Sequence, residues 1–327
     1  MVDRLNIVST QSKSSEPPFA NSKNGWRYEA QAKFERMWLM DPEQFNPMRN
    51  CLERERLQRT KDLIQRFMDA KNKWVADLAC GGGTLSKHLY ELGAHIHALD
   101  IASNALSRLK MTVPQIAQTF QQCLPHTTLE DDSYDLVIAN EVIAYLPTEQ
   151  LRLFMAELSR LVKPQGYVIC STPLDLNTQD PLQRFASLAE TEFKIHEWVC
   201  SYHRLYIRLK NFFSAPSHFA KARKDREYLL QESQNRQGFS RKWFLWNSHG
   251  LLAAVWSIVQ YITNPIANFI KQSRSLMLTL EKICRLLLGD AGISHAIFIA
   301  TRRPLQPLHL TKNETPIERK GKREIWE

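Results

Sequence analysis

Three consecutive glycines, residues 81–83, stand between a short apolar run and a helical pattern in the stretch VADLACGGGTLSKHL. A strand that ends in glycines and enters a helix lets backbone N–H groups approach a ligand, at the helix end that favours negative charge. Asp77 lies inside the apolar run, and Asp100 ends the next one, about 20 residues further on. This spacing predicts a site for a nucleotide-like ligand, whereas a tight turn alone would need neither carboxylate.

Two kinds of ligand compete for this loop. Gly81, Gly83 and Ser86 follow the G-x-G-x-x-(small) pattern of dinucleotide-binding loops, in which an acid like Asp100 holds ribose hydroxyls. Asp77 favours another ligand, because a carboxylate inside the strand can bind a cationic amino group, for which a pyrophosphate offers no counterpart. The loop therefore favours a ligand that carries both a ribose and a cation.

Two segments carry a family resemblance. The loop DLACGGGTLS resembles the D-L-G-C-G-x-G motif of class I S-adenosylmethionine-dependent methyltransferases, with Ala79 where that family usually has its first glycine. The segment LEDDSYDLVIANEVIAYLP (129–147) resembles the family's D-x-S-F-D-L-V…E-V-L-x-H-L segment. The resemblance, to a methyltransferase domain of type 11 or 12, covers about residues 73–173 and the last apolar run. It implies S-adenosyl-L-methionine as the cofactor and methylation as the activity.

The resemblance also assigns roles to residues of the cofactor site. The methionine moiety would be lined by Asp77, Ala79, Gly81 and Gly83. Asp100 would bind the ribose hydroxyls, and Ile101 would lie beside the adenine. Cys123 and Leu124 fall where the family often has an acid that reads the adenine amine, so adenine recognition would rest on backbone groups.

Residues for the chemical step follow the fourth apolar run. By resemblance, Asn140 and Glu141 would lie near the transferred methyl, and Tyr145 stands where the family frequently has a histidine. Methyl transfer is an in-line displacement, so alignment of the reactants is the main requirement and no metal is needed. A base helps where the acceptor is an oxygen or a protonated amine. The candidates are Glu141, Tyr145 and His126, in that order.

Simpler structural roles stay open for two of these acids: Asp100 could cap the following helix, and Glu141 could be a charge favoured at a helix start.

Elements that would position these residues alternate along the chain. Apolar runs that read as strands occupy 73–79, 95–100, 116–122, 134–140, 166–172, 193–203 and 294–303, with helical patterns between the first five. Strands that alternate with helices predict an α/β fold with a doubly wound, mostly parallel sheet. By resemblance the sheet has seven strands, and the last is antiparallel and inserted beside the fifth.

The chain divides into six predicted segments. They are a leader without regular structure (1–24), N-terminal helices (25–72), the cofactor-binding core (73–203), a basic and apolar helical insertion (204–293), the last core strand (294–303) and a flexible tail (304–327). The leader has no continuous apolar stretch, and the six cysteines form no C-x-x-C pair, so a cytoplasmic protein is expected.

The insertion carries the charge excess. Between residues 204 and 290 there are 14 Lys and Arg against 5 Asp and Glu, a difference of +9 that equals the formal net charge of the whole chain. WFLWNSHGLLAAVWSIVQYI (243–262) is apolar except for Gly250, Ala253, Ser257 and Gln260, and its polar interruption at 247–249 predicts a non-spanning segment. Asn264-Pro265 predicts a helix start, and Gly289 an end. The insertion is either a lid over a lipid-like substrate, a surface on anionic membrane, or a subdomain that buries its own apolar faces.

Three function classes follow from these observations. The first is methyl transfer to an oxygen or nitrogen of a small, hydrophobic or lipid-like acceptor. Glu53 and Arg56, as E-x-x-R, resemble the start of nodulation-type amine N-methyltransferases. The second is an RNA methyltransferase that uses the basic insertion, although residues 140–143 lack the (D/N)-P-P-(Y/F) signature of amino-methylating nucleic-acid enzymes. The third is a non-catalytic binding protein that retains the fold.

Overall fold

The computed structural model describes residues 25–43, 46–174, 180–234, 236 and 238–304. The predicted leader (1–24) and all but the first residue of the predicted tail (304–327) lie outside these residues.

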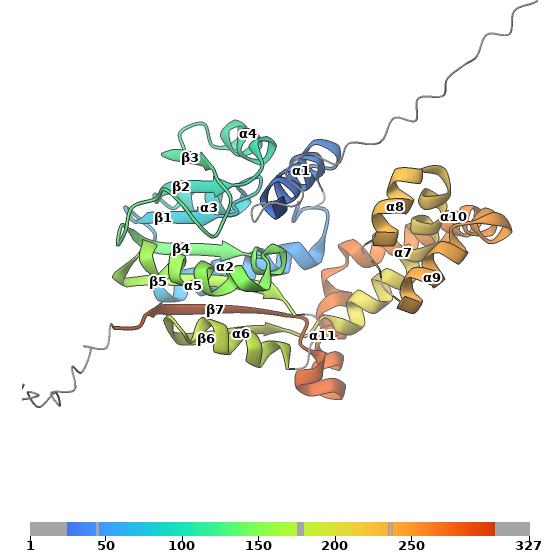
Figure 1. Cartoon of the computed structure of the whole chain (residues 1–327). Helices are drawn as coiled ribbons and strands as arrows, with labels where there is room; N and C mark the ends of the chain where they lie inside the picture. The colour runs from blue at the N-terminus through green and yellow to red at the C-terminus, as the bar shows by residue number, and fades with distance from the viewer. Residues whose placement is uncertain (1–24, 44–45, 175–179, 235, 237, 305–327) are drawn as a thin grey trace, which may run out of the picture.

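One seven-stranded sheet organises the chain, with strand order β3-β2-β1-β4-β5-β7-β6 (Figure 1). The strands are β1 (Trp74–Leu78), β2 (His95–Asp100), β3 (Gln118–Gln121), β4 (Tyr134–Asn140), β5 (Val162–Pro173), β6 (Phe193–Ser201) and β7 (His295–Arg302). The first five strands pair in parallel, and β7 runs antiparallel to both β5 and β6. The predicted fold class, including the antiparallel last strand beside the fifth, is confirmed.

Helices cover both faces of the sheet. On one face, α5 (Leu151–Leu161) and α6 (Pro181–Ala189) pack with alternate strand residues such as Ala76 and Val137. On the other, α2 (Cys51–Phe67), α3 (Thr84–Glu91) and α4 (Ser103–Thr112) pack with the intervening residues, such as Val75 and Leu136. Central parallel strands are buried on both faces, which explains why their sequences are continuous apolar runs.

A group of helices is inserted between β6 and β7. It comprises α7 (Arg204–Lys224), α8 (Arg226–Gln234), α9 (Gly238–Asn247), α10 (Gly250–Gln272) and α11 (Arg274–Leu288), and a short 3₁₀ turn, η3 (Gly289–Gly292), leads into β7. Figure 1 shows this group beside the carboxyl ends of the strands, with α10 on its far side from the sheet. The helices join the sheet through α2: Arg59 bonds Ser201 Oγ at 2.8 Å and Glu281 of α11 at 2.7 Å.

The prediction of a helix start at Asn264-Pro265 is wrong. α10 runs through Pro265, and the chain instead breaks at residues 248–249 and at Ser273, whose hydroxyl caps α11. An internal proline costs a helix about 3 kcal/mol, which packing along α7 offsets here, since Ala253, Ala267 and Ile270 are all buried. Of the described helices, α10 is the one whose length and composition would allow it to cross a membrane.

Candidate active site

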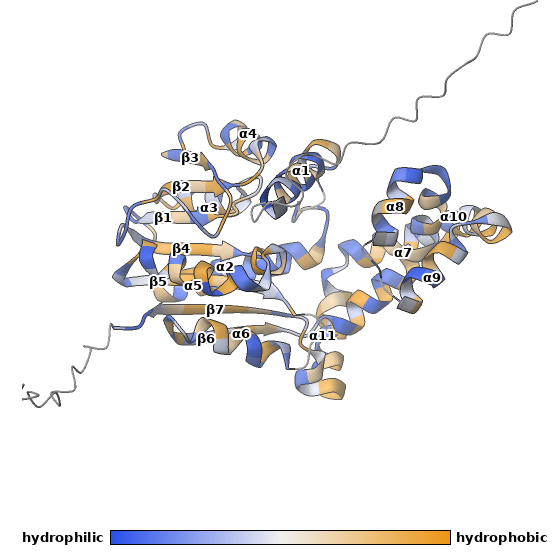
Figure 2. Cartoon of the chain, in the orientation of Figure 1, coloured by the Kyte–Doolittle hydropathy of each residue, from blue (hydrophilic) through white to orange (hydrophobic). Residues whose placement is uncertain are grey.

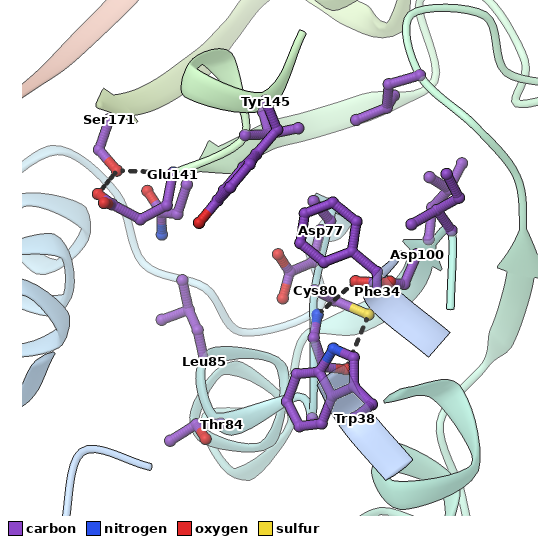
Figure 3. A pocket seen from close by; sticks show the side chains of 18 of the residues that line it. Phe34, Trp38, Asp77, Cys80, Thr84, Leu85, Asp100, Glu141, Tyr145 and Ser171 are labelled. Atoms are coloured by element: carbon purple, nitrogen blue, oxygen red, sulfur yellow. Dashed lines mark hydrogen bonds between the residues drawn. The ribbon is translucent and has the colours of Figure 1, made fainter. Parts of the chain in front are cut away.

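A cavity of about 460 Å³ opens at the carboxyl ends of β1, β2, β4 and β5 (Figure 3). The carboxyl edge of a parallel sheet is the usual ligand site of doubly wound folds. Helices α1 (Gly25–Met40) and α2 supply the outer wall. Residues that line it include Phe34, Trp38, Glu53, Arg56, Asp77, Ala79, Gly81, Asp100, Ile101, Cys123, Leu124, Asn140, Glu141, Tyr145 and Ser171.

The glycine loop adopts left-handed backbone at several positions. Ala79, Gly81 and Gly83 have φ of +59°, +54° and +75°. A Cβ on Gly81 would lie 3.0 Å from Trp38, on the cavity side, so this glycine keeps the loop open. A Cβ on Gly83 would instead lie 2.0 Å from Leu109 of α4. Gly83 is not a lining residue, and its lack of a Cβ lets α4 pack against the loop; its predicted ligand contact stays a prediction.

Asp77 is a buried carboxylate with one side-chain partner. It is 4% exposed, lines the cavity, and accepts a hydrogen bond from Ser86 Oγ of α3. Burial raises the pKa of Asp77 to about 6, an effect that the Ser86 bond opposes and the nearby Asp100 reinforces. A carboxylate held in this way gains most from a cation that enters the cavity.

Asp100 fixes the chain on both sides of the cavity edge and is not the cap of α4. Its Oδ1 accepts from Ala102 N at 2.9 Å, before the helix begins, and its Oδ2 accepts from Gly81 N at 2.8 Å. The carboxylate also lines the cavity, and burial raises its pKa. Asp100 therefore fixes the glycine loop and keeps lone pairs available for a ligand hydroxyl.

The next wall of the cavity holds most of the predicted adenine contacts. Ile101, Cys123 and Leu124 line it, together with Gln122. His126, a predicted candidate base, is exposed and is not a lining residue. The following residue explains its position: the backbone N–H and hydroxyl of Thr127 bond Glu157 of α5 at 2.8 and 2.7 Å, which draws the chain away from the cavity.

Glu141 is the centre of a polar cluster at the other end of the cavity (Figure 3). It has φ +62°, and its carboxylate accepts from Ser171 Oγ at 2.9 Å, from Arg56 Nη1 at 3.2 Å and from His295 Nε2. Burial opposes its ionisation, but His295, Arg56 and Ser171 prevail and hold the pKa of Glu141 at about 2. The carboxylate is thus charged at every working pH, and its role is more than that of a helix-start charge.

His295 and Arg56 were not predicted as site residues. His295 is fully buried at the start of β7, and its Nε2 is bonded to Glu141; burial lowers the pKa of His295, an effect that the charge of Glu141 opposes. Nothing in the apolar run SHAIFIATRR indicated a partner 154 positions away. Arg56 carried a signal in its spacing, because Glu53 lies one helical turn before it and accepts from it at 3.2 Å.

The α1 helix forms a wall that the sequence did not predict as part of the site. Phe34 meets Tyr145 edge to face, with ring centroids 5.0 Å apart, and Figure 3 shows both rings in the cavity between Glu141 and the glycine loop. Glu35, one residue on, caps α4 from outside: Ser103 N and Asn104 N donate to it at 2.6 and 3.1 Å. This bond pair holds α1 against the sheet edge.

Asn140, between the two ends of the cavity, has a side-chain oxygen that lacks a hydrogen-bond donor in the described part of the chain. Its Oδ1 is buried and has no hydrogen-bond partner among the residues the structure describes. Together with Asp77 and Asp100, it gives the cavity acceptors for a cationic group and for hydroxyls. Within the same described ranges, no group of three His, Cys, Asp or Glu side chains could hold a metal ion.

The central part of the chain is similar to known methyltransferases. A family model described as a methyltransferase domain matches residues 76–170. A ubiquinone biosynthesis O-methyltransferase of Hydrogenovibrio crunogenus is 27% identical over 115 residues, which is 34% of this chain and 47% of the relative. An uncharacterized methyltransferase of Synechocystis is 32% identical over 121 residues, 36% of this chain and 57% of the relative. The chain spans about half the length of the curated relatives it matches.

Two solved methyltransferase structures are similar to about half of this chain. Magnesium protoporphyrin IX methyltransferase from Synechocystis is 17% identical, covers 54% of this chain and 89% of its own, and has a TM-score of 0.46. The N-methyltransferase NodS from Bradyrhizobium japonicum is 17% identical, covers 53% and 89%, and has a TM-score of 0.44. With the family match, the strand order and the glycine loop in agreement, the chain contains a class I S-adenosylmethionine-dependent methyltransferase domain.

Proposed function

We propose that this chain transfers the methyl group of S-adenosylmethionine to an oxygen or nitrogen of a small, apolar or lipid-like acceptor. The observation that carries the proposal is one cavity with two unlike ends. Asp77, Asp100 and the glycine loop lie at one end, and Glu141, Arg56 and Tyr145 lie at the other. The apolar ring of Phe34, which meets Tyr145, supports an acceptor with an apolar body, while Trp38 lies against the glycine loop.

The residues fit the cofactor on features of this chain alone. Asp77 would hold the amino group, Asp100 the ribose hydroxyls, and Ile101, Cys123 and Leu124 the adenine, while Asn140 Oδ1 gains a donor. When bound, S-adenosylmethionine supplies an electrophilic methyl group. The protein's part is to align the acceptor with it and to exclude water, for which the α1 wall is suited.

The end of the cavity that holds Glu141 and Tyr145 orients the methyl acceptor and does not remove its proton. Glu141, with a pKa of about 2, is a weak base but a strong hydrogen-bond acceptor. Burial raises the pKa of Tyr145, and the charges of Glu141 and Glu53 raise it further, so its hydroxyl remains a donor. We therefore infer an acceptor that loses its proton without a strong base, such as an acidic phenol or a neutral amine.

The test is transfer of label from methyl-labelled S-adenosylmethionine into an extract of cells that lack the protein. We expect label in the organic-soluble fraction with the wild type and none with Asp77→Asn. Label in RNA would replace this proposal with the RNA methyltransferase. Cofactor binding without label in any fraction, including one enriched in membranes, would favour a non-catalytic binding protein.

A further inference from the structure

The outward face of α10 is apolar along its whole length. Its exposed side chains recur every three or four residues and so form one stripe. They are Leu251, Val255, Ile258, Tyr261, Ile262, Ile266 and Phe269, of which Leu251 is 82% and Ile258 70% exposed. Figure 2 shows this apolar helix at the edge of the molecule away from the sheet.

The inward face of the same helix mixes small, polar and apolar side chains, and the apolar ones include the buried Ile270 and the partly buried Trp256, whose ring centroid lies 5.7 Å from that of Phe219 of α7. Ala253 and Ala267 are buried against α7, and Ser217 of α7 donates to Asn264 Oδ1 at 3.0 Å. A surface helix of a water-soluble protein normally carries polar side chains on its outer face. The outer face of α10 is apolar instead, and it suits a nonpolar environment.

The preceding helix adds aromatic side chains and cations. On α9, Phe239 and Trp246 are 81% and 63% exposed, and the Trp243 and Trp246 rings lie 5.7 Å apart. Arg241 and Lys242 are exposed between them. Tryptophan next to Lys and Arg is the composition of segments that lie at the boundary between lipid headgroups and acyl chains.

We propose that α9 and α10 form a peripheral docking surface for a bilayer with anionic headgroups. The α10 stripe and the α9 aromatics enter the headgroup region, and the basic side chains of the inserted helices face the lipid phosphates. The charge excess of +9 between residues 204 and 290, from 14 basic and 5 acidic residues, complements an anionic surface.

A spanning arrangement fits less well, although α10 has the required length. The helix packs along α7, which ends in the exposed cations Lys221, Arg223 and Lys224. Insertion of α10 across a bilayer would carry these charges into hydrocarbon or strip the Ser217–Asn264 contact, and both are unfavourable. Docking in the plane of the membrane keeps α7 in water.

Membrane binding goes beyond the proposed function, and its test does not depend on enzyme activity. It also places the active site near the lipid: Arg36 of α1, the cavity wall, forms an ion pair with Glu227 of α8, which belongs to the same inserted helices as α9 and α10. An acceptor dissolved in the bilayer would thus lie close to the helix that closes the cavity.

The experiment is flotation of the full chain with phosphatidylcholine vesicles, with and without phosphatidylglycerol. We expect flotation with the anionic vesicles, release at high salt, and at least about tenfold weaker binding by the double variant Ile258→Glu/Ile262→Glu. The matched control is Met111→Glu/Leu153→Glu, which charges two exposed apolar side chains on α4 and α5 and should float like the wild type. Circular dichroism checks that both variants are folded.

Three outcomes would overturn the proposal. The first is a folded Ile258→Glu/Ile262→Glu variant that floats like the wild type. The second is a wild-type dimer in light scattering that this variant makes monomeric without any vesicle binding, which would assign the face to a second copy of the chain. The third is wild-type protein that only detergent, and not alkaline carbonate, removes from membranes, which would make α10 a true span.

Discussion

Replacing Asp77 by Asn should stabilise the ligand-free protein while it abolishes cofactor binding. The folded state raises the pKa of this carboxyl from 3.8 to about 6, a shift of about 2 units. Because the folded state binds the proton more tightly than the unfolded state, ionisation of Asp77 destabilises the fold. At about 1.36 kcal/mol per unit, the penalty is about 3 kcal/mol at neutral pH.

The destabilisation by ionised Asp77 depends on pH in a defined way. The penalty is absent below about pH 4, where Asp77 is protonated in both states, grows as pH rises toward 6, and is constant above that value. Asn is neutral and still offers Ser86 an acceptor. The variant's gain in unfolding free energy should therefore be about 3 kcal/mol at pH 7.5 and about half that at pH 5.

Thermal unfolding followed by circular dichroism measures this difference. A gain of about 3 kcal/mol corresponds to a rise of roughly 4–5 °C in Tm at pH 7.5 for a chain of this length, and S-adenosylmethionine should raise the Tm of the wild type only. Asp135→Asn is the matched control, because Lys163 and Trp74 N overcome burial to lower the pKa of Asp135, and its loss should destabilise the fold. A Tm of Asp77→Asn at or below the wild type, or an equal gain at pH 5 and 7.5, would refute the reasoning.

Four further predictions concern the same cavity. The affinity for S-adenosylmethionine, measured by calorimetry, should fall about tenfold per pH unit below about pH 6, because a cation must displace the proton of Asp77; flat affinity from pH 7 to 5 would contradict this. Glu141→Gln should lower kcat at least tenfold and leave cofactor affinity within about twofold, since it removes the charged acceptor contact; equal turnover would exclude Glu141 from catalysis. Ala79→Gly should raise the unfolding free energy by up to about 1 kcal/mol, because Ala79 has φ +59°, and a lower denaturant midpoint would show that the loop needs its Cβ. Glu35→Ala should weaken cofactor binding by about 1 kcal/mol through loss of the α4 cap, whereas the exposed Glu29→Ala on the same helix should leave it unchanged.

The sequence predicted the parts of the fold that depend on local pattern. Apolar runs between helical patterns placed all seven strands, because central parallel strands must be apolar on both faces. The glycine loop at residues 81–83 and the two carboxylates, Asp77 and Asp100, could be predicted from their spacing along two successive strands and the loop between them. The helix start predicted at Pro265 is wrong, because packing along α7 continues the helix where local propensity favours a start.

The acceptor end of the site could not be predicted in the same way. Glu141 meets Arg56 across 85 positions and His295 across 154, and only the sheet order, with β7 inserted beside β5, brings them together. Phe34 and Trp38 lie in a helix with little amphipathic pattern, so no periodicity indicated which side would face a cavity. Such contacts arise from the order of the strands in the sheet, and the spacing of residues along one sequence does not indicate them.

The contact between Glu35 of α1 and the first turn of α4 bears on the rate of product release. The carboxylate that closes the first turn of α4 also fastens the aromatic wall over the cavity. Exit of the spent cofactor past α1 would require this contact to open, which would leave the N–H groups of Ser103 and Asn104 without their acceptor. We expect product release past α1, rather than methyl transfer, to be the slowest step of the catalytic cycle.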